Sequence, residues 1–183
     1  MRKILYAFSI AMGVMWAAST AQAQVKATEP QVITLPKNVQ ISGKTLDGQA
    51  FDLAKNKGKV LLVMFWATDC AVCRDKMHEL RDNAKGWQGK PFSIVLISAD
   101  RRMSDVDSYN AIINASVPAK ERLTQLWALD PGYRDSLGTL EVMRSRNAST
   151  LPLSFVIDKK GDVVKRYQGR IPAEVWDDIS ELL

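Results

Sequence analysis

The sequence predicts an α/β fold, because two apolar segments of strand length flank a segment with helical periodicity. Residues 60–66 and 92–98 are apolar almost throughout, as strands covered on both faces need to be. Between them, Cys73, Met77 and Leu80 recur at intervals of four and three residues, which places them on one face of a helix. The order strand, helix, strand predicts a right-handed parallel crossover, and hence a central sheet flanked by helices.

An N-terminal β-hairpin is predicted ahead of the first of these strands. Residues 39–42 alternate between apolar and polar side chains, and residues 50–53 are the second strand candidate. Asp47 and Gly48 lie between them and form a dipeptide that is common in tight hairpin turns. We therefore expect two short antiparallel strands as an extension before the central sheet.

The two helices that follow the apolar strands have recognisable ends. The first is expected to begin after Thr68 or Asp69, because both are common N-cap residues, and to end at Gly86. The second is predicted from Ser104, because Asp107 follows three residues later in an arrangement similar to a capping box. The first of these helices would then lead the chain from one parallel strand to the next.

The second half of the chain is predicted to add a hairpin and a last helix. Residues 154–158 and 163–167 have strand character around a Lys-Lys-Gly turn, which indicates an antiparallel pair. A final helix is expected from about Ala173. In the less regular stretch before the hairpin, residues 127–129 are expected to form a short strand and residues 134–143 a helix.

Composition and charge narrow the class of protein. The chain has 183 residues, of which 46% are hydrophobic and 25% charged, as in a single globular domain. Two cysteines exclude a disulfide-rich scaffold. The net charge is +5, but no run of five like charges occurs, so no nucleic-acid partner is expected.

The N-terminus has the pattern of a secretory signal peptide. Arg2 and Lys3 precede an uncharged apolar run at residues 4–18, and Ala21 and Ala23 supply small residues at a cleavage site. The run is shorter than the roughly 20 residues that span a bilayer. Cleavage after Ala23 is therefore favoured over the alternative, an N-terminal membrane anchor.

The expected organisation has three parts. Residues 1–23 are the signal peptide, residues 24–38 a flexible lead-in, and residues 39–183 the folded domain. Export would place the domain in an oxidising compartment, and we expect the bacterial periplasm.

The chemistry is concentrated in the segment Cys70-Ala71-Val72-Cys73, at the junction between the first apolar strand and its helix. The free N–H groups and the dipole of a helix N-terminus favour an anion, so the pKa of Cys70 should fall below the ordinary thiol value of about 8.5. Cys73 follows one turn later and can close a reversible disulfide with Cys70. A Cys-x-x-Cys between a strand and a helix therefore predicts redox chemistry.

Two other interpretations of the cysteine pair are weaker. A structural zinc site needs four ligands, whereas the chain offers one pair and His78. Haem attachment needs a histidine where Arg74 stands. A purely structural disulfide would close a very short loop and stabilise the fold little. We therefore expect no metal, haem or other small-molecule cofactor.

Two motifs carry a resemblance to a known family. Residues 65–73 (FWATDCAVC) and residues 151–161 (LPLSFVIDKKG) resemble the thioredoxin superfamily, and most of all its exported TlpA/ResA-like thiol-disulfide oxidoreductases. The resemblance covers roughly residues 39–183. It implies a thioredoxin fold, with a central mixed sheet flanked by helices and an N-terminal β-hairpin extension, and it implies exchange of disulfides with protein cysteines.

The resemblance also implies roles for single residues. Cys70 would be the attacking thiol and Cys73 the resolving thiol. Pro152 would match the family's cis-proline facing the pair, which would leave the backbone of Leu151 free to pair with an extended substrate. Trp66 would either flank the site as a substrate contact or pack in the core.

The chain departs from the family pattern at the positions that manage charge. Asp69 stands where an aromatic residue often precedes the first cysteine; its carboxylate opposes thiolate formation, and it is a candidate for proton handling or for the helix N-cap. The family's buried acid would lie at Met64 or Lys76, neither of which is acidic. Asp75 or Glu79 are possible substitutes.

These features favour a reductant. The dipeptide between the cysteines carries no charge and Asp69 opposes a thiolate, so the potential should lie nearer about −270 mV than about −120 mV. Such a reductant needs a membrane protein as electron donor. Two alternatives stay open: a thioredoxin-fold binding or adaptor protein with a passive disulfide, and a peroxiredoxin-like peroxidase, whose peroxide-orienting threonine would fall at Ala67.

Overall fold

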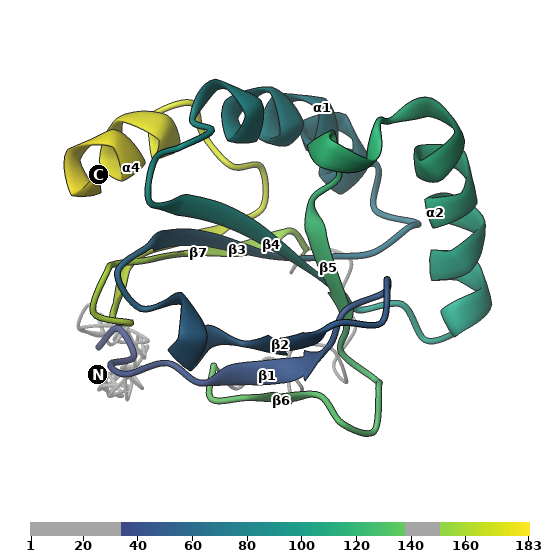
Figure 1. Cartoon of the computed structure of the whole chain (residues 1–183), viewed down its shortest axis with the longest axis horizontal. Coiled ribbons are helices and arrows are strands. Elements are labelled where there is room, and N and C mark those ends of the chain that lie inside the picture. The colour runs from purple at the N-terminus through teal and green to yellow at the C-terminus, as the bar shows by residue number, and fades with distance from the viewer. Residues whose placement is uncertain (1–33, 138–150) are drawn as a thin grey trace, which may run out of the picture. The chain divides into compact units, whose positions relative to one another are not determined.

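The computed structural model describes residues 34–137 and 151–183 and shows a five-stranded mixed sheet (Figure 1). The three strands β3, β4 and β5 are parallel, while β7 and β8 are antiparallel to their neighbours. The order across the sheet is β5-β4-β3-β7-β8. The strand bounds are Val60–Trp66 for β3, Phe92–Ser98 for β4, Thr124–Trp127 for β5, Leu153–Ile157 for β7 and Val163–Gln168 for β8.

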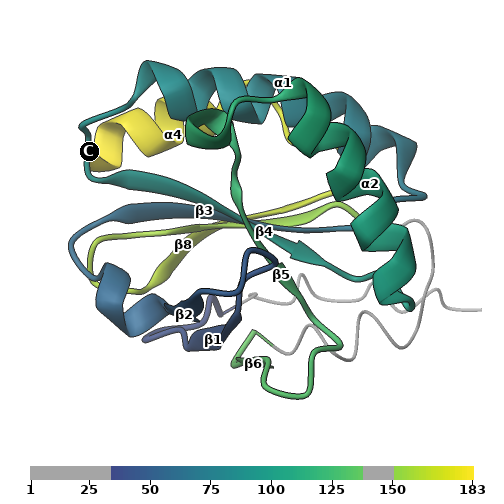
Figure 2. The same ribbon diagram turned by 45° about the vertical axis from the view of Figure 1, so that its right-hand side comes forward.

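Helices cover one face of this sheet. Figures 1 and 2 show α1 and α4 lying over that face, with α2 beside the edge formed by β5. The helix bounds are Ala71–Gly86 for α1, Met103–Ser116 for α2 and Val175–Leu182 for α4, with short 3-10 helices at Leu53–Asn56 and Ala119–Glu121. The predicted β3–α1–β4 crossover is confirmed, because α1 joins two strands that pair in parallel.

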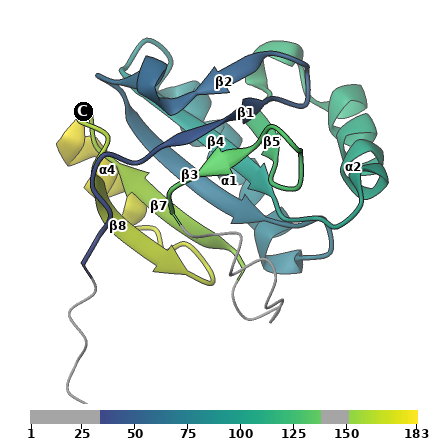
Figure 3. The same ribbon diagram turned by 90° about the horizontal axis from the view of Figure 1, so that it is seen from below.

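A second, three-stranded antiparallel sheet lies on the opposite side (Figure 3). It consists of β1 (Ile41–Lys44), β2 (Ala50–Asp52) and β6 (Arg134–Asp135), in the order β2-β1-β6. The predicted N-terminal hairpin is confirmed, and Gly48 in its turn has a φ of +88°, which a side chain rarely adopts. The hairpin of β1 and β2 is therefore two strands of a three-stranded sheet, because β6 pairs with β1.

The helix expected over residues 134–143 is wrong at its start. Arg134 and Asp135 form β6, whose backbone pairs with Ser42 and Ile41 of β1. The hydrogen bonds that β1 offers at its open edge override the local helical preference. Residues 138–143 lie outside the described residues.

Three other element starts differ from the expected ones. The short strand expected at residues 127–129 lies earlier, because β5 pairs with β4 from Thr124 onward. The second helix begins at Met103 and uses Arg102, without a side-chain cap, in place of the expected capping box at Ser104. The last helix begins two residues after Ala173. Each shift is small, because an element's ends are less sharply defined by the sequence than its buried middle.

Alternation along β3 explains why its sequence is apolar throughout. Its even-numbered side chains pack with those of α1 and α4, and its odd-numbered side chains pack with the three-stranded sheet. Every residue of β3 is at most 1% exposed. Burial on both faces is what a strand at the centre of a layered fold requires.

The N-terminal segments expected from the sequence lie mostly outside the described residues. This applies to the signal peptide and to residues 24–33 of the lead-in. The end of the lead-in contacts the hairpin formed by β7 and β8: the carbonyl of Pro36 accepts from the N–H of Val163 at 2.9 Å, and the N–H of Asn38 donates to Asp162 at 2.9 Å. Among the described residues, no helix is both long and apolar enough to cross a membrane.

Candidate active site

Three segments meet at one edge of the central sheet. Residues 67–70 follow β3 and residues 99–102 follow β4; these two strands end together, because Trp66 is paired with Ser98. Leu151 and Pro152 precede β7, which is antiparallel to β3 and therefore begins at the same edge. The carboxyl ends of parallel strands are where open α/β sheets place their sites.

The two cysteines form a disulfide at the start of α1. Their sulfur atoms are 2.06 Å apart and their Cα atoms 5.2 Å apart. Cys70 is the N-cap of α1, and its Sγ accepts a hydrogen bond from the N–H of Cys73 at 3.2 Å. The expected cap at Thr68 or Asp69 is therefore wrong, because the sulfur of Cys70 takes the place of a capping oxygen.

The two sulfurs differ in accessibility. Cys70 is half-buried, whereas Cys73 is 0% exposed and packs with Met77 and Leu80 under the helix. A thiolate at Cys70 would gain from the helix dipole and from the Cys73 N–H. The arrangement can open and close a disulfide with one sulfur within reach of another molecule.

Leu151 and Pro152 border the motif loop across the sheet edge. The peptide bond between them is cis, as the family resemblance implies. Pro152 is buried, and its carbonyl accepts from the N–H of Gly169 at 2.8 Å. Leu151 is half-buried against the same core cluster as Cys70. Within the described part of the chain, no backbone hydrogen bond joins Leu151 to another residue.

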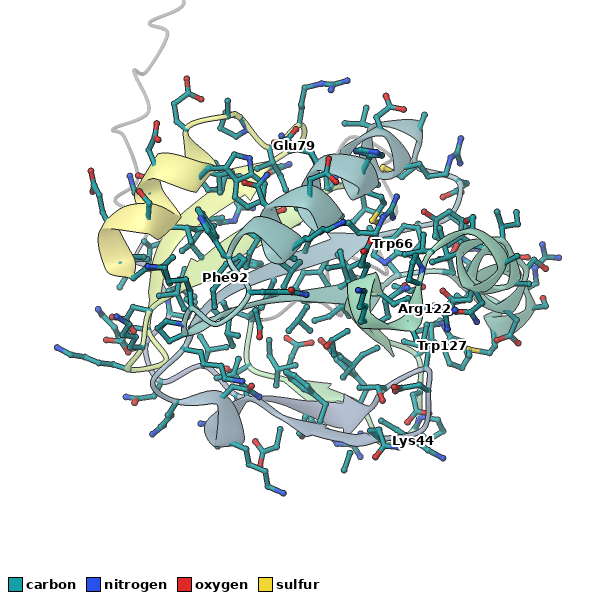
Figure 4. The ribbon with its side chains drawn as sticks, turned by 45° about the horizontal axis from the view of Figure 1, so that its top comes forward. Lys44, Trp66, Glu79, Phe92, Arg122 and Trp127 are labelled. Carbon is teal, nitrogen blue, oxygen red and sulfur yellow. A yellow bond between two sulfur atoms is a disulfide. The ribbon has the colours of Figure 1, made fainter. Side chains whose placement is uncertain are left out.

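Trp66 packs in the core and has no exposed surface. Its side chain is 0% exposed and lies 4.9 Å, centroid to centroid, from the ring of Tyr109 in α2. Burial raises the pKa of Tyr109, and the nearby guanidinium groups of Arg81 and Arg74 partly oppose this. Figure 4 shows Trp66 between α1 and the sheet. Of the two interpretations left open for Trp66, the structure shows core packing and presents no surface to a substrate.

The expected acids are placed differently from one another. Asp69 is exposed, and its side chain does not cap the helix. Asp75 lies on the surface, 3.8 Å from Arg170. Lys76 is buried and pairs with Glu79 at 2.7 Å, and Glu79 also accepts from the indole N–H of Trp176 at 2.6 Å.

Lys76 and Glu79 both lie in α1, and Glu79 is linked to α4 by the hydrogen bond that it accepts from Trp176. Burial acts to raise the pKa of Glu79, but the hydrogen bonds from Lys76 and Trp176 outweigh it and hold that pKa below its ordinary value. Glu79 lies on the side of α1 that faces α4 (Figure 4). Glu79 is therefore held between Lys76 of its own helix and Trp176 of α4.

A pH-dependent contribution to stability follows from this pair. We expect Glu79→Gln to lower the free energy of unfolding by about 1 kcal/mol at pH 7, because buried Lys76 loses its counter-charge while the exposure of Glu79 screens the effect. Since the folded pKa lies below the unfolded one, the contribution is complete above about pH 5 and is lost as the pH falls through the folded pKa.

Urea denaturation at pH 7, 5 and 3 measures this contribution. The difference between wild type and Glu79→Gln should be equal at pH 7 and 5 and should shrink at pH 3. Glu181→Gln, an exposed change on α4, serves as the matched control and should have no effect. A difference that grows on acidification would show that the ionised carboxylate of Glu79 is not the form that stabilises the fold.

Sequence reasoning missed Asp100, which follows β4. It is 3% exposed, and its carboxylate accepts from the N–H and the hydroxyl of Thr68 and from the hydroxyl of Ser98. An acidic residue two positions after an apolar strand was the available signal. Its partner Thr68 lies 32 residues earlier, so only the sheet pairing brings them together.

The two residues weighed for the metal and haem alternatives, His78 and Arg74, lie at exposed positions of α1. Within residues 34–137 and 151–183, no group of three or more His, Cys, Asp or Glu side chains is arranged to hold a metal ion. His78 lies on the exposed side of α1, 2.8 Å from Asp82. Arg74, in the position that haem attachment would need for histidine, donates to the carbonyl of Thr68.

A half-exposed and a fully buried cysteine, joined at the first helix of this mixed sheet, define a thioredoxin-fold thiol-disulfide oxidoreductase. The chain belongs to the Redoxin family, which matches residues 34–182.

Relatives and solved structures agree with this class. The thiol-disulfide oxidoreductase ResA of Bacillus thuringiensis subsp. konkukian is 26% identical over 133 residues, which cover 73% of this chain and 68% of that protein. The sporulation thiol-disulfide oxidoreductase A of Bacillus subtilis is 24% identical and is matched over 98% of each chain. A crystal structure of a thiol:disulfide interchange protein from Chlorobium tepidum has a TM-score of 0.59 at 25% identity, covering 81% of this chain and 95% of that one.

Proposed function

We propose that this protein reduces disulfides of other proteins outside the cytoplasm, with Cys70 as the attacking and Cys73 as the resolving thiol. The Cys70 thiolate attacks a substrate disulfide; its S–S bond breaks, one substrate sulfur leaves as a thiolate, and a mixed disulfide forms. Cys73 then attacks Cys70, which releases the second substrate thiolate and leaves the Cys70–Cys73 disulfide. Two electrons pass to the substrate. The difference in exposure between the two sulfurs is the observation that carries this assignment.

Leu151 and Pro152 are proposed to hold the substrate segment. The backbone of Leu151 makes no hydrogen bond to another described residue, and it lies at the sheet edge where the motif loop begins. An extended substrate strand can use such backbone groups by β-augmentation. Pro152 would shape the surface from below through its buried ring.

The proposed direction of electron flow rests on the charges around Cys70. Among the described residues, no cationic side chain donates to its sulfur: Arg74 donates to the carbonyl of Thr68, and Lys76 is paired with Glu79. The adjacent carboxylate of Asp69 opposes a thiolate. A less stabilised thiolate makes the disulfide form relatively more stable, which lowers the reduction potential.

A redox titration tests this direction. In glutathione and dithiothreitol buffers, we expect the Cys70–Cys73 couple to have a potential near about −270 mV, as in reducing members of the fold, rather than about −120 mV. The fraction reduced is measured by alkylation and mass spectrometry, with Cys70→Ser as the variant that cannot form the couple. A potential above about −160 mV would contradict a reducing role.

The proposed location rests on the N-terminal sequence pattern. Residues 1–23 would direct export and be removed, leaving a reductant in an oxidising compartment. Electrons would then have to come through a membrane protein with a dithiol of lower or similar potential.

Protein recovered from a bacterial cell envelope tests this location. N-terminal sequencing should start at Gln24, the residue after the expected cleavage site. A variant with Ala23→Arg, which disrupts that site, should keep the uncleaved N-terminus. Wild-type protein that still begins at Met1 and stays in the cytosolic fraction would contradict export.

A further inference from the structure

Hydrogen bonds between Thr68 and Asp100 hold the turn that precedes Cys70 against the segment that follows β4. We call these hydrogen bonds the clamp. We propose that Asp100 is a positioning residue for Cys70 and acts through Thr68; this rests on the proposed role of Cys70 as the attacking thiol. The carboxylate of Asp100 accepts from the N–H of Thr68 at 3.0 and 3.1 Å, and from its hydroxyl at 2.6 Å. Thr68 stands two residues before the reactive sulfur.

Asp100 is itself held firmly. Its carboxylate accepts from the hydroxyl of Ser98 at 2.7 Å, its N–H donates to that hydroxyl at 3.1 Å, and its carbonyl accepts from the indole of Trp127 at 2.7 Å. Ser98 is the last residue of β4 and Trp127 the last residue of β5. Figure 4 shows Trp127 beside this edge of the sheet. Asp100 is therefore anchored to two strands of the central sheet, through its carboxylate to Ser98 and through its carbonyl to Trp127.

The burial of this carboxylate needs an explanation. Of the carboxylates in the described ranges, Asp100 is the one that is buried, and it has no ion pair with a cation there. A charge taken out of water is costly unless hydrogen bonds compensate for it. Three groups donate hydrogen bonds to the carboxylate of Asp100, and two of them, the N–H and the hydroxyl, belong to Thr68. The turn that contains Thr68 must therefore keep one geometry for the buried charge to be compensated.

The clamp reaches Cys70 through the backbone. The carbonyl of Thr68 accepts from the guanidinium of Arg74, one turn into α1, and the N–H of Cys70 donates to the carbonyl of Ala67 at 3.1 Å. Thr68 is thus held by β4 on one side and by α1 on the other. This arrangement keeps the sulfur of Cys70 in place over the N–H of Cys73.

The surroundings favour a role at the site over a role in the hydrophobic core. Thr68, Asp69 and Asp100 line an open hollow of about 640 Å³. Thr68 is only half-buried, so changes at its side chain should alter the clamp while leaving the core intact.

Substitutions at Thr68 and at Asp100 distinguish an effect on the position of the Cys70 sulfur from an effect of the charge of Asp100. Thr68→Val removes the hydroxyl donor without changing any charge, and Thr68→Ser restores it. Asp100→Asn removes the charge and one acceptor oxygen. Asp107→Asn, at an exposed position on α2, is the matched control. The readouts are the pH profile of Cys70 alkylation in the reduced protein, kcat/KM for insulin reduction, and urea stability.

We expect Thr68→Val and Asp100→Asn each to lower kcat/KM about tenfold and to move the Cys70 alkylation profile to higher pH, because the sulfur moves away from the helix N–H groups. Thr68→Ser should return both quantities to within about twofold of wild type, and Asp107→Asn should leave them unchanged.

Three outcomes would overturn the clamp. The first is an Asp100→Asn profile that moves to lower pH while Thr68→Val is silent, which would make Asp100 a charge effect. The second is a loss of stability alone. The third is a Thr68→Ser variant as impaired as Thr68→Val. A wild type that fails to reduce insulin would refute the proposed function instead, and the alkylation profiles would still decide the role of Asp100.

Discussion

Replacing Cys70 with serine is expected to abolish disulfide reduction, by at least about a thousandfold in rate, whereas Cys73→Ser should perform the first half of the reaction and then stop. The reason is the difference in exposure. Cys70 is half-buried at the N-terminus of α1 and can approach a substrate sulfur, but Cys73 is 0% exposed and can only meet the sulfur of Cys70. Cys73→Ser should therefore accumulate a mixed disulfide through Cys70.

Insulin precipitation and non-reducing electrophoresis measure the two halves of the reaction. Cys73→Ser should yield a band equal in mass to the protein plus one insulin chain, which disappears with dithiothreitol, and Cys70→Ser should yield none. A trapped adduct on Cys73 in the Cys70→Ser variant would reverse the assigned roles. Inactive wild type would support the adaptor alternative, and turnover of hydrogen peroxide faster than by a free thiol would support the peroxidase alternative.

The elements that sequence patterns predicted best are those buried on both faces. The bounds of β3 and β4 match the apolar runs at residues 60–66 and 92–98, because a strand between two layers has few polar positions to obscure its length. The face of α1 that carries Cys73 was also predicted, since one side of that helix packs on the sheet. In both cases the positions of the apolar residues in the local sequence show which positions are buried.

Features that depend on a distant partner were missed. The strand β6 forms because β1 leaves an edge open, and the sequence around Arg134 carries no sign of that edge. Asp100 looks like an ordinary loop residue until β4 pairs with β3 and brings it to Thr68. The cap of α1 was misplaced for a different reason: a cysteine sulfur is not among the usual capping groups, and here it accepts the N–H that an oxygen would normally take.

Trp66→Ala is expected to give the largest loss of stability, about 3–5 kcal/mol in the free energy of unfolding. The indole is 0% exposed at the end of β3, is packed beneath α1 and contacts Tyr109, so its removal leaves a cavity where sheet and helices meet. Trp66→Phe should cost much less, about 1–2 kcal/mol. In the described part of the chain the indole Nε1 has no hydrogen-bond partner, so phenylalanine loses volume and no hydrogen bond.

The phenylalanine variant distinguishes core packing from substrate contact. If Trp66 acts only as packing, Trp66→Phe lowers the urea midpoint while KM for insulin and the alkylation profile of Cys70 stay at wild-type values. A substrate contact would produce the reverse, a KM raised about tenfold with little loss of stability. Trp176→Phe is the comparison, because its indole donates to Glu79 at 2.6 Å and its replacement removes a hydrogen bond as well as volume. Since the ring of Trp66 has no exposed surface, a raised KM would require that the core opens when substrate binds.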